Sequence, residues 1–332
     1  MKRWVLNIIQ GPTRDAVTKP KSDVVKIAKT LNYNKISIQM QNTREMSDQM
    51  LTILINAVAA EVSYGDIILY QYPTLLGYRF EESFISYLKN KGVKIILLMH
   101  DSEWLRGIYP DERKLLNSVN VIIGHGEALT NALQSNQVVT KIIKKELFDY
   151  LYEEELPYSH DLEKKLAIAG NLDKSIFIED WSTIMPELYA FGKKSKDKFG
   201  DNVFYQGSFS NEELLKNIPK NFFGIAWDDN LPGGGDYQQY TRFNSPHKVS
   251  LYLSLGMPVI VWDESAIGEY ITKNKLGFTI SHPKHIAEQF RILDDDKLLE
   301  YKTNALRIAK MLRDGMFTRK AIIEAENIIF LE

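Results

Sequence analysis

The chain contains no cysteine among its 332 residues. This absence excludes a disulfide scaffold, a thiolate zinc site and a cysteine nucleophile. Long apolar runs are also missing, because every apolar stretch is far shorter than the roughly 20 residues that a membrane-spanning helix requires. The start of the chain, Met1–Ile9, is basic but has too short an apolar run for a secretory signal peptide. We therefore expect a cytoplasmic protein that makes at most peripheral contact with a membrane.

An excess of charge of one sign is missing as well, since 41 basic side chains nearly balance 43 acidic ones. Such a balance gives no global field that attracts nucleic acid, so we expect no nucleic-acid partner. The six histidines lack the spacing of metal ligands, and we expect no metal site. The segment Gly11–Asp15 follows the first apolar run but lacks the glycine fingerprint G-x-G-x-x-G. A nicotinamide-dependent oxidoreductase is therefore disfavoured.

The sequence does contain a regular alternation of β-branched runs and helical patterns. Hydrophobic residues make up 44% and charged residues 25% of the chain, as in globular proteins. The first half predicts five strands that are apolar on both faces: Trp4–Ile9, Lys35–Gln39, Asp66–Tyr70, Val93–Met99 and Val119–Ile123. The helical patterns between them cover Asp23–Leu31, Glu45–Glu61 and Phe80–Asn90. This alternation is typical of a doubly wound parallel sheet.

The alternation breaks in the charged, irregular segment Lys144–Lys165 and then resumes. The second half predicts further strands at Leu166–Ala169, Leu188–Phe191, Val203–Tyr205, Phe222–Trp227, Pro258–Trp262 and Gly277–Ile280. Its predicted helices are Asn211–Asn217, Pro246–Leu255 and Ile267–Asn274, followed by two helices joined near Gly315. We expect two α/β domains, at residues 1–155 and 156–314, with the last helix (315–332) crossing back to the first. Ligands of open α/β sheets bind beyond the carboxyl ends of the strands, so the expected site is a cleft between the two sheets.

The most informative motif is Asn244–Val261, which predicts a capped helix followed by a strand. Ser245 suits the N-cap and Pro246 the first helical position, while Gly256 ends the helix. A helix N-terminus presents unpaired N–H groups and the positive end of the dipole, and Lys248 adds a full charge to this turn. Such a turn can bind a diphosphate. The alternative is an ordinary capped helix with a surface lysine.

The segments that carry a family resemblance are Ala169–Leu172, Phe223–Asp228, Phe243–Lys248 and Leu255–Val261. Together with His100-Asp101 in the first half and Gly315–Arg319 near the end, they resemble GT-B glycosyltransferases over nearly the whole chain. The chain is similar to two branches of these enzymes. One contains the bacterial β-1,6-galactofuranosyltransferases of O-antigen synthesis. The other contains the hexosyltransferases that extend O-linked N-acetylglucosamine on serine-rich-repeat adhesins.

This resemblance implies a GT-B fold of two Rossmann-like domains and an inverting transfer of a hexose from a UDP-sugar to a glycan or glycoprotein acceptor. UDP-glucose, UDP-N-acetylglucosamine and UDP-galactofuranose all remain possible donors. The acceptor belongs either to an adhesin under O-glycosylation or to a surface polysaccharide. The resemblance further implies that the enzyme needs no cofactor and no metal, and that it forms a homo-oligomer.

The resemblance also implies which residues bind the donor. Lys248 matches a lysine that contacts the diphosphate, and the neighbours that form the same turn are Pro246, His247, Val249, Ser250 and Leu251. Lys174, after the Gly170-Asn171 turn, stands where the adhesin branch has arginine. Its ammonium can neutralise a phosphate, but it cannot form the two parallel hydrogen bonds of an arginine guanidinium. Phe209 matches an aromatic residue that contacts the nucleotide. Asn171 belongs to the donor turn, although an ordinary turn is the alternative there.

Acidic residues that follow the predicted strands are candidates for chemistry on the sugar and on the acceptor. Asp101, at the end of one strand, is our candidate for the base that takes the proton of the acceptor hydroxyl, with His100 or Glu103 as substitutes. A His-Asp pair that only orients the next loop is the alternative. Asp228 is predicted to accept a hydrogen bond from a hydroxyl group of the hexose. The segment Pro232–Asp236 reads either as a loop that closes over the donor or as a flexible insertion.

The loop that follows the first strand, with Thr13, Arg14 and Asp15, lines the cleft in GT-B enzymes and faces donor and acceptor. A solvated loop is the alternative reading. Two other functions stay open for the chain as a whole: a nucleotide-sugar epimerase of the same fold, which needs no acceptor, and a non-catalytic partner that binds UDP-sugar without turnover.

Overall fold

The computed structural model describes residues 1–9, 18–109, 111–156, 159–196, 198–228 and 237–331. These residues form two compact units. The first contains the described residues up to Lys145 together with those from Gly315 onward, and the second those from Glu146 to Asp314. Among the described residues, each unit has one six-stranded sheet. The expected fold class, α/β with two doubly wound sheets, is confirmed.

The sheet of the first unit is parallel throughout its described strands. Its strands are β1 (Arg3–Ile9), β2 (Asn34–Gln39), β3 (Ile67–Tyr72), β4 (Lys94–Met99), β5 (Val121–His125) and β6 (Lys141–Lys145). They lie in the order β2-β1-β3-β4-β5-β6. The helices of this unit are α1 (Thr18–Thr30), α2 (Asp48–Val58), α3 (Tyr78–Asn90), α4 (Arg113–Leu116), α5 (Gly126–Ser135) and α12 (Met316–Leu331).

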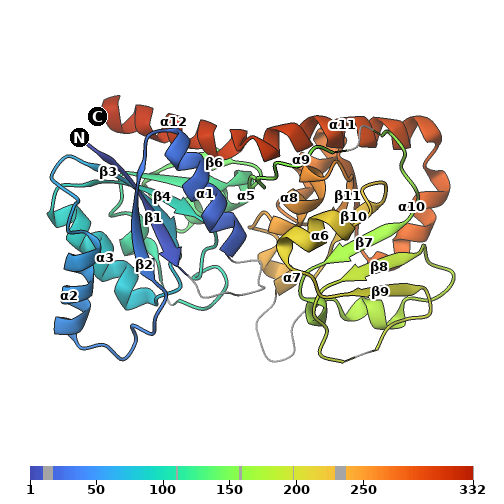
Figure 1. Cartoon of the computed structure of the whole chain (residues 1–332), viewed down its shortest axis with the longest axis horizontal. Coiled ribbons are helices and arrows are strands. Elements are labelled where there is room, and N and C mark those ends of the chain that lie inside the picture. Colours follow the sequence, from blue (N-terminus) through green and yellow to red (C-terminus); the bar gives the residue numbers. More distant parts are fainter. Residues whose placement is uncertain (10–17, 110, 157–158, 197, 229–236, 332) are drawn as a thin grey trace. The chain divides into compact units, whose positions relative to one another are not determined.

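One face of this sheet is covered by α1 together with α12, the last helix of the chain (Figure 1). Ile322 and Ala325 of α12 are fully buried in the same hydrophobic cluster as Val5 and Leu69 of the sheet. Glu326 of α12 accepts hydrogen bonds from the Arg3 guanidinium at 2.6 Å and from the Tyr33 hydroxyl at 2.7 Å. The last helix of the chain therefore completes the core of the first unit.

Strand β2 corrects one expectation, because it is not apolar on both faces. Only Ile36 and Ile38 are buried, while the residues between and beside them are exposed. β2 lies at the edge of the sheet, where one face remains open to solvent. Strand β6 and helix α5 were not predicted, and the last two residues of β6 fall in the segment that we interpreted as irregular. The N-terminal part of the first unit ends at Lys145, whereas the sequence placed the domain boundary at residue 155.

The second unit repeats the parallel arrangement. Its strands are β7 (Leu166–Ala169), β8 (Leu188–Phe191), β9 (Val203–Gly207), β10 (Phe223–Ala226), β11 (Val259–Trp262) and β12 (Gly277–Ile280). They lie in the order β12-β11-β10-β7-β8-β9. The helices are η1 (Leu172–Lys174), η2 (Ile176–Asp180), α6 (Asn211–Asn217), α7 (Tyr237–Tyr240), α8 (His247–Ser254), α9 (Gly268–Lys273), η3 (Pro283–His285), α10 (Ile286–Ile292) and α11 (Asp295–Arg313).

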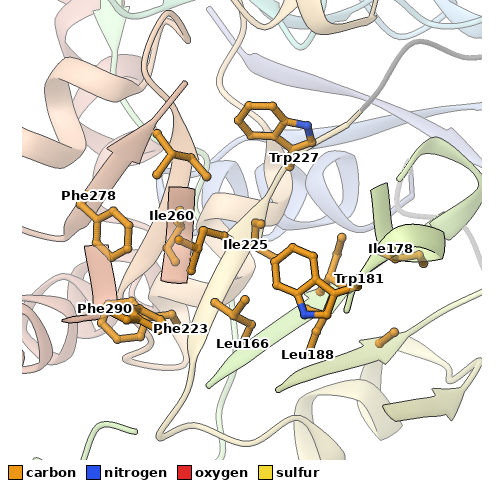
Figure 2. Packing of buried hydrophobic residues seen from close by; sticks show 14 of the residues in the cluster. Leu166, Ile178, Trp181, Leu188, Phe223, Ile225, Trp227, Ile260, Phe278 and Phe290 are labelled. Atoms are coloured by element: carbon orange, nitrogen blue, oxygen red, sulfur yellow. The ribbon is translucent and has the colours of Figure 1, made fainter. Parts of the chain in front are cut away.

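The core of the second unit is rich in aromatic rings (Figure 2). The Phe223 ring lies 5.8 Å from that of Phe278 and 5.1 Å from that of Phe290, between ring centroids. Trp181 is also buried in this core, beside Leu188 in the view of Figure 2. No helix among the described residues is long and apolar enough to cross a membrane.

The order of strands reverses once in each sheet. In the first unit the reversal lies between β1 and β3, and in the second it lies between β7 and β10. Ligands of doubly wound sheets bind beyond the carboxyl ends of the strands at such a reversal. The segments that leave β7 and β10 begin with Gly170-Asn171 and Trp227-Asp228. In the first unit, the segment that follows β1 lies outside the described residues, and β3 is followed by Pro73.

Candidate functional site

Three segments of the second unit meet at the reversal of its sheet. The Lys248 ammonium, in the first turn of α8, donates a hydrogen bond to Asp228 Oδ1 at 2.5 Å, and both side chains are about one-fifth exposed. A Cβ on Gly170, whose φ is +118°, would lie 3.1 Å from Lys248 Cε. The predicted Lys248, Asp228 and Gly170-Asn171 turn are therefore neighbours. The prediction did not include the ion pair between Lys248 and Asp228.

The start of α8 differs from the expected cap. Pro246 takes the N-cap position with φ −63° and ψ 130°, and the helix begins at His247. Ser245 was expected to cap the helix, but its hydroxyl is buried and has no hydrogen-bond partner among the described residues. Because proline has φ near −65° both at a cap and in the first turn, the sequence alone did not distinguish the two positions.

Three buried polar atoms near this helix start have no hydrogen-bond partner among the described residues: Asn244 Oδ1, Ser245 Oγ and Ser250 Oγ. Buried polar groups in proteins are nearly always hydrogen-bonded, either to protein or to ordered water or ligand. A helix N-terminus adds N–H groups and a positive partial charge to the same place. The turn can therefore bind an anion that also accepts hydrogen bonds.

The other predicted residues of the turn are mostly packed inside the unit. The His247 ring lies 5.6 Å from the Phe148 ring and 5.0 Å from the Tyr150 ring. Val249 and Leu251 are buried hydrophobic residues of α8. These three side chains hold the turn in place, and Val249 and Leu251 offer a ligand only their backbone.

The loop after β7 combines a structural residue with a candidate basic one. Asn171 Oδ1 accepts a hydrogen bond from the Asp173 amide at 3.1 Å and so caps η1. Lys174 ends this short helix and is half-buried. The ring of Phe209, just after β9, lies 6.1 Å from that of Phe191 at the end of β8. Lys174 thus follows β7 and Phe209 follows β9, two strands that β8 separates in the sheet, and their role in binding remains a prediction.

A small pocket opens beside Asp228. It is lined by Ala226, Trp227, Asp228, Thr241, Pro246, Val261, Trp262, Ser265 and Ile267. The Arg242 guanidinium lies over the Trp262 ring at 4.6 Å. The pocket thus combines tryptophan rings with the Asp228 carboxylate and the hydroxyls of Thr241 and Ser265. Such a lining suits a ligand that has both apolar C–H surfaces and hydroxyl groups. Trp262 was not predicted as a site residue, although its place at the carboxyl end of β11 is a signal for such a role.

The hydroxyl of Tyr252 connects α8 to the end of β7. It accepts a hydrogen bond from the Ala169 amide at 2.8 Å, at the end of β7. A Cβ on Gly224 of β10 would lie 2.2 Å from Tyr252 Cγ, so the ring lies directly against this strand. Burial raises the pKa of Tyr252, which keeps its hydroxyl neutral. Tyr252 therefore ties α8 to the two strands at the reversal.

Replacing Tyr252 with phenylalanine is expected to lower the free energy of unfolding by about 1–3 kcal/mol, because the buried Ala169 amide loses its acceptor. Urea denaturation measures this change. Tyr189→Phe is the matched control, since the Tyr189 hydroxyl is partly exposed and bonds Glu187 at 3.2 Å. Equal losses in the two variants would contradict the role of Tyr252.

The first unit gathers polar side chains at the carboxyl ends of β3 and β4. His100 directly follows β4 and is 7% exposed, and its Nε2 lies 2.9 Å from Gln71 Oε1. The Gln71 amide nitrogen, fully buried, donates to the carbonyl oxygens of Leu6 at 2.8 Å and of Lys21 at 3.2 Å. The glutamine therefore links β1, α1 and His100. It was not singled out from the sequence.

The loop that carries His100 and Asp101 is organised by one buried carboxylate. Glu112 accepts hydrogen bonds from the Tyr72 hydroxyl, from the Ser102 hydroxyl at 2.7 Å and from the Glu103 amide at 2.9 Å. Burial raises the pKa of Glu112, while these hydrogen bonds act in the opposite direction. No signal in the sequence pointed to Glu112, which stands in a charged segment.

Asp101 itself is the more open member of the predicted pair. Its side chain is 37% exposed, and its Oδ2 lies 3.9 Å from Arg106 Nη1. The same guanidinium nitrogen binds Glu103 more closely, at 2.6 Å. Asp101 and Glu103 therefore share one cation.

A buried pair of opposite charge lies next to this loop. The Lys21 ammonium donates to the Pro73 carbonyl, and burial lowers the pKa of Lys21 to about 8. Glu81 accepts from the Thr74 amide at 2.6 Å and from the Tyr70 hydroxyl at 2.5 Å. Burial raises the pKa of Glu81 to about 7. Both groups ionise near neutral pH as a result.

Some predicted residues lie outside the described part of the chain. These are Thr13, Arg14 and Asp15 of the first loop and the segment Pro232–Asp236. Among the residues that the structure does describe, no group of three or more His, Asp and Glu side chains could hold a metal ion.

Two family models match the chain and together span most of it. Residues 2–147 match "Glucosyltransferase 3-like, N-terminal domain". Residues 166–325 match "Glucosyltransferase 3-like, C-terminal domain".

Curated relatives match over nearly the full length. The chain is 30% identical to "Glucosyltransferase 3" of Streptococcus gordonii, with 98% of each chain covered. It is 28% identical to "Beta-1,6-galactofuranosyltransferase WbbI" of Escherichia coli (strain K12), with 97% of each covered. The resemblance to both branches, stated above from the motifs, is confirmed.

Solved structures share the fold at low sequence identity. A sucrose-phosphate synthase from Thermosynechococcus elongatus matches with a TM-score of 0.64 at 9% identity, over the full length of both chains. An alpha-glucosyltransferase in complex with UDP and a 13-mer DNA matches with a TM-score of 0.63 at 13% identity, over 99% of both. These likenesses confirm the GT-B type of fold.

Proposed function

The chain belongs to the glucosyltransferase 3-like family of glycosyltransferases, and from this premise we propose that it transfers a hexose from a UDP-sugar to a hydroxyl group of a glycan acceptor. The observation that supports this most directly is the turn where Lys248, Asp228 and Gly170 meet at the reversal of the second sheet. A solved alpha-glucosyltransferase of the same fold is in complex with UDP.

In this proposal the second unit binds the donor. The Lys248 ammonium and the N-terminus of α8 bind the diphosphate, and Lys174 adds a second positive charge. The Ser245 hydroxyl, which has no hydrogen-bond partner among the described residues, can donate a hydrogen bond to a phosphate oxygen. The pocket beside Asp228 holds the hexose, and the Asp228 carboxylate accepts a hydrogen bond from one of the sugar hydroxyls. These charges stabilise the UDP that departs during transfer.

The first unit supplies the group that receives the acceptor proton, from the His100-Asp101 segment. The acceptor oxygen attacks the anomeric carbon while its O–H bond breaks, and the bond from that carbon to the diphosphate oxygen breaks with its electron pair leaving on UDP. The anomeric configuration is inverted. No cofactor or metal takes part, because lysines and the helix N-terminus neutralise the leaving group.

The names of the relatives indicate which donor sugars should be tested first. One relative is called a glucosyltransferase and another a galactofuranosyltransferase, so UDP-glucose and UDP-galactofuranose are the first donors to test, with UDP-N-acetylglucosamine as the third. We propose a glycan of an adhesin or of a surface polysaccharide as the acceptor. We further propose that the enzyme is cytoplasmic and works as a homo-oligomer.

The test is UDP release by the purified protein with each of the three donors, in the presence and absence of glycans ending in N-acetylglucosamine or glucose. We expect one donor to give release that depends on the acceptor. Interconversion of the donor sugar without an acceptor would indicate an epimerase instead. UDP binding without release for any pair would indicate a non-catalytic binding protein.

A further inference from the structure

We propose that His100 Nδ1 is the atom that accepts the proton of the acceptor hydroxyl, and that Gln71 is a positioning residue that holds His100 in the tautomer required for this step. The inference rests on the proposed transferase function and assigns its base. Asp101 was the first candidate from the sequence. In this assignment it contributes negative charge to the loop and does not act as the base.

The tautomer follows from what each atom of the Gln71 amide can bond. The Nε2 group has two hydrogens, and it donates to the carbonyls of Leu6 and Lys21. Carbonyl oxygens only accept hydrogen bonds, so the orientation of the amide is fixed. The atom that faces His100 is therefore Gln71 Oε1, at 2.9 Å from Nε2 of the ring.

An amide oxygen also only accepts, so His100 Nε2 must carry a hydrogen. In the neutral imidazole this leaves the lone pair on Nδ1. A general base needs its lone pair on the atom that meets the substrate proton. When Nδ1 takes that proton, the ring becomes a cation with both nitrogens protonated, and Gln71 Oε1 still accepts from Nε2.

Asp101 is less suited to the task. The acceptor hydroxyl is a very weak acid, and a base whose pKa lies near the working pH removes its proton most effectively. An ordinary aspartate has a pKa near ~3.9, whereas an ordinary histidine has one near ~6.5. The Arg106 cation, 3.9 Å from Asp101, further stabilises the charged carboxylate and so makes it a weaker proton acceptor.

Charged groups on every neighbouring element set the proton affinity of His100. Lys21 on α1 carries a positive charge that disfavours a second cation, while carboxylates favour it. Among the residues that the structure describes, the charged side chains of this cluster include Lys21, Glu81, Asp101, Glu103, Arg106 and Glu112. A change of charge at Gln71, in contact with the ring, adds to this balance.

The experiment compares the pH dependence of kcat/KM in the wild type and in Gln71→Glu. A base must be unprotonated to act, so the rate rises with pH through the pKa of His100. A carboxylate at position 71 accepts the same hydrogen from Nε2 but adds a negative charge, which raises that pKa. We expect the acidic limb of the profile to move up by about 1 pH unit or more.

Gln71→Leu is the matched variant, since it removes the acceptor without adding charge. We expect kcat to fall at least tenfold with KM for the donor unchanged, because the ring is no longer held in one tautomer. Asp101→Asn should retain the acidic limb of the pH profile of kcat/KM. A limb that stays in place in Gln71→Glu, or that disappears in Asp101→Asn, would overturn the inference.

A spectroscopic measurement on the wild type keeps the test independent of variants that fail to fold. Nitrogen NMR of protein labelled at histidine, with His100 assigned by its loss in His100→Gln, reports which ring nitrogen carries hydrogen. We expect hydrogen on Nε2 at neutral pH, and hydrogen on Nδ1 alone would overturn the inference. If the wild type releases no UDP with any donor and acceptor, the proposed function fails instead, and the two failures are distinguishable.

Discussion

Lys248→Ala is expected to reduce the rate of hexose transfer on the order of 100-fold. The diphosphate gains negative charge as its bond to the sugar breaks, and the Lys248 ammonium is a full positive charge at the N-terminus of α8. The loss should appear mainly in kcat, because an interaction that strengthens as the charge develops stabilises the transition state more than the bound donor. Steady-state kinetics with the donor identified by UDP release measure it.

The ion pair with Asp228 makes a second variant informative. Asp228→Asn keeps the size of the side chain but removes the charge that neutralises Lys248. Lys310→Ala, at an exposed position of α11, is the control for loss of a lysine charge and should leave the rate unchanged. A loss below about threefold for Lys248→Ala would argue against its contact with the leaving group.

Gly192→Ala is expected to lower the free energy of unfolding by about 4 kcal/mol or more, which is a large value for one substitution. Gly192 follows β8 and has φ +140°, where residues with a Cβ are strained. A Cβ there would lie 1.8 Å from the carbonyl oxygen of Gly170, which is far inside contact distance. Because Gly170 lies against Lys248, the relief of this clash should also weaken UDP binding.

Gly207→Ala separates the steric effect from the backbone effect. Gly207 has φ +98°, but nothing lies within 4 Å of an added Cβ. We expect this control to cost only the backbone strain, about 1–3 kcal/mol. The midpoint of urea unfolding and the Kd for UDP compare the two variants, and equal effects would show that the close approach to Gly170 is unimportant.

The parts of the fold that were predicted from the sequence are those with a strong local pattern. Strands Leu166–Ala169, Leu188–Phe191 and Gly277–Ile280 agree with the structure residue for residue, because short buried strands are continuous apolar runs. Strand β6 has lysine at three of its positions, including both ends, and therefore gave no such signal. Its place at the edge of the sheet, beside β5, allows charged residues to remain partly in water.

The candidate site was predicted as separate residues and not as contacts. Lys248 was recognised because the helix start around it is a local motif, but its partner Asp228 is 20 positions away. Gln71 and His100 are 29 positions apart, and only the pairing of β3 with β4 brings them together. A glutamine inside an apolar strand has no periodic pattern that reveals its role, so the structure was required to find it.

The position of α12 has a consequence for how the protein is made. Ribosomes synthesise the chain from its N-terminus, and domains usually fold in that order as they emerge. Here the first unit lacks Ile322 and Ala325 of its own core until α12 has been translated. The second unit, complete at Asp314, has all its residues earlier. The unit whose translation begins first is thus the one that completes its core last, and until α12 has been translated its sheet lacks the helix that covers one apolar face.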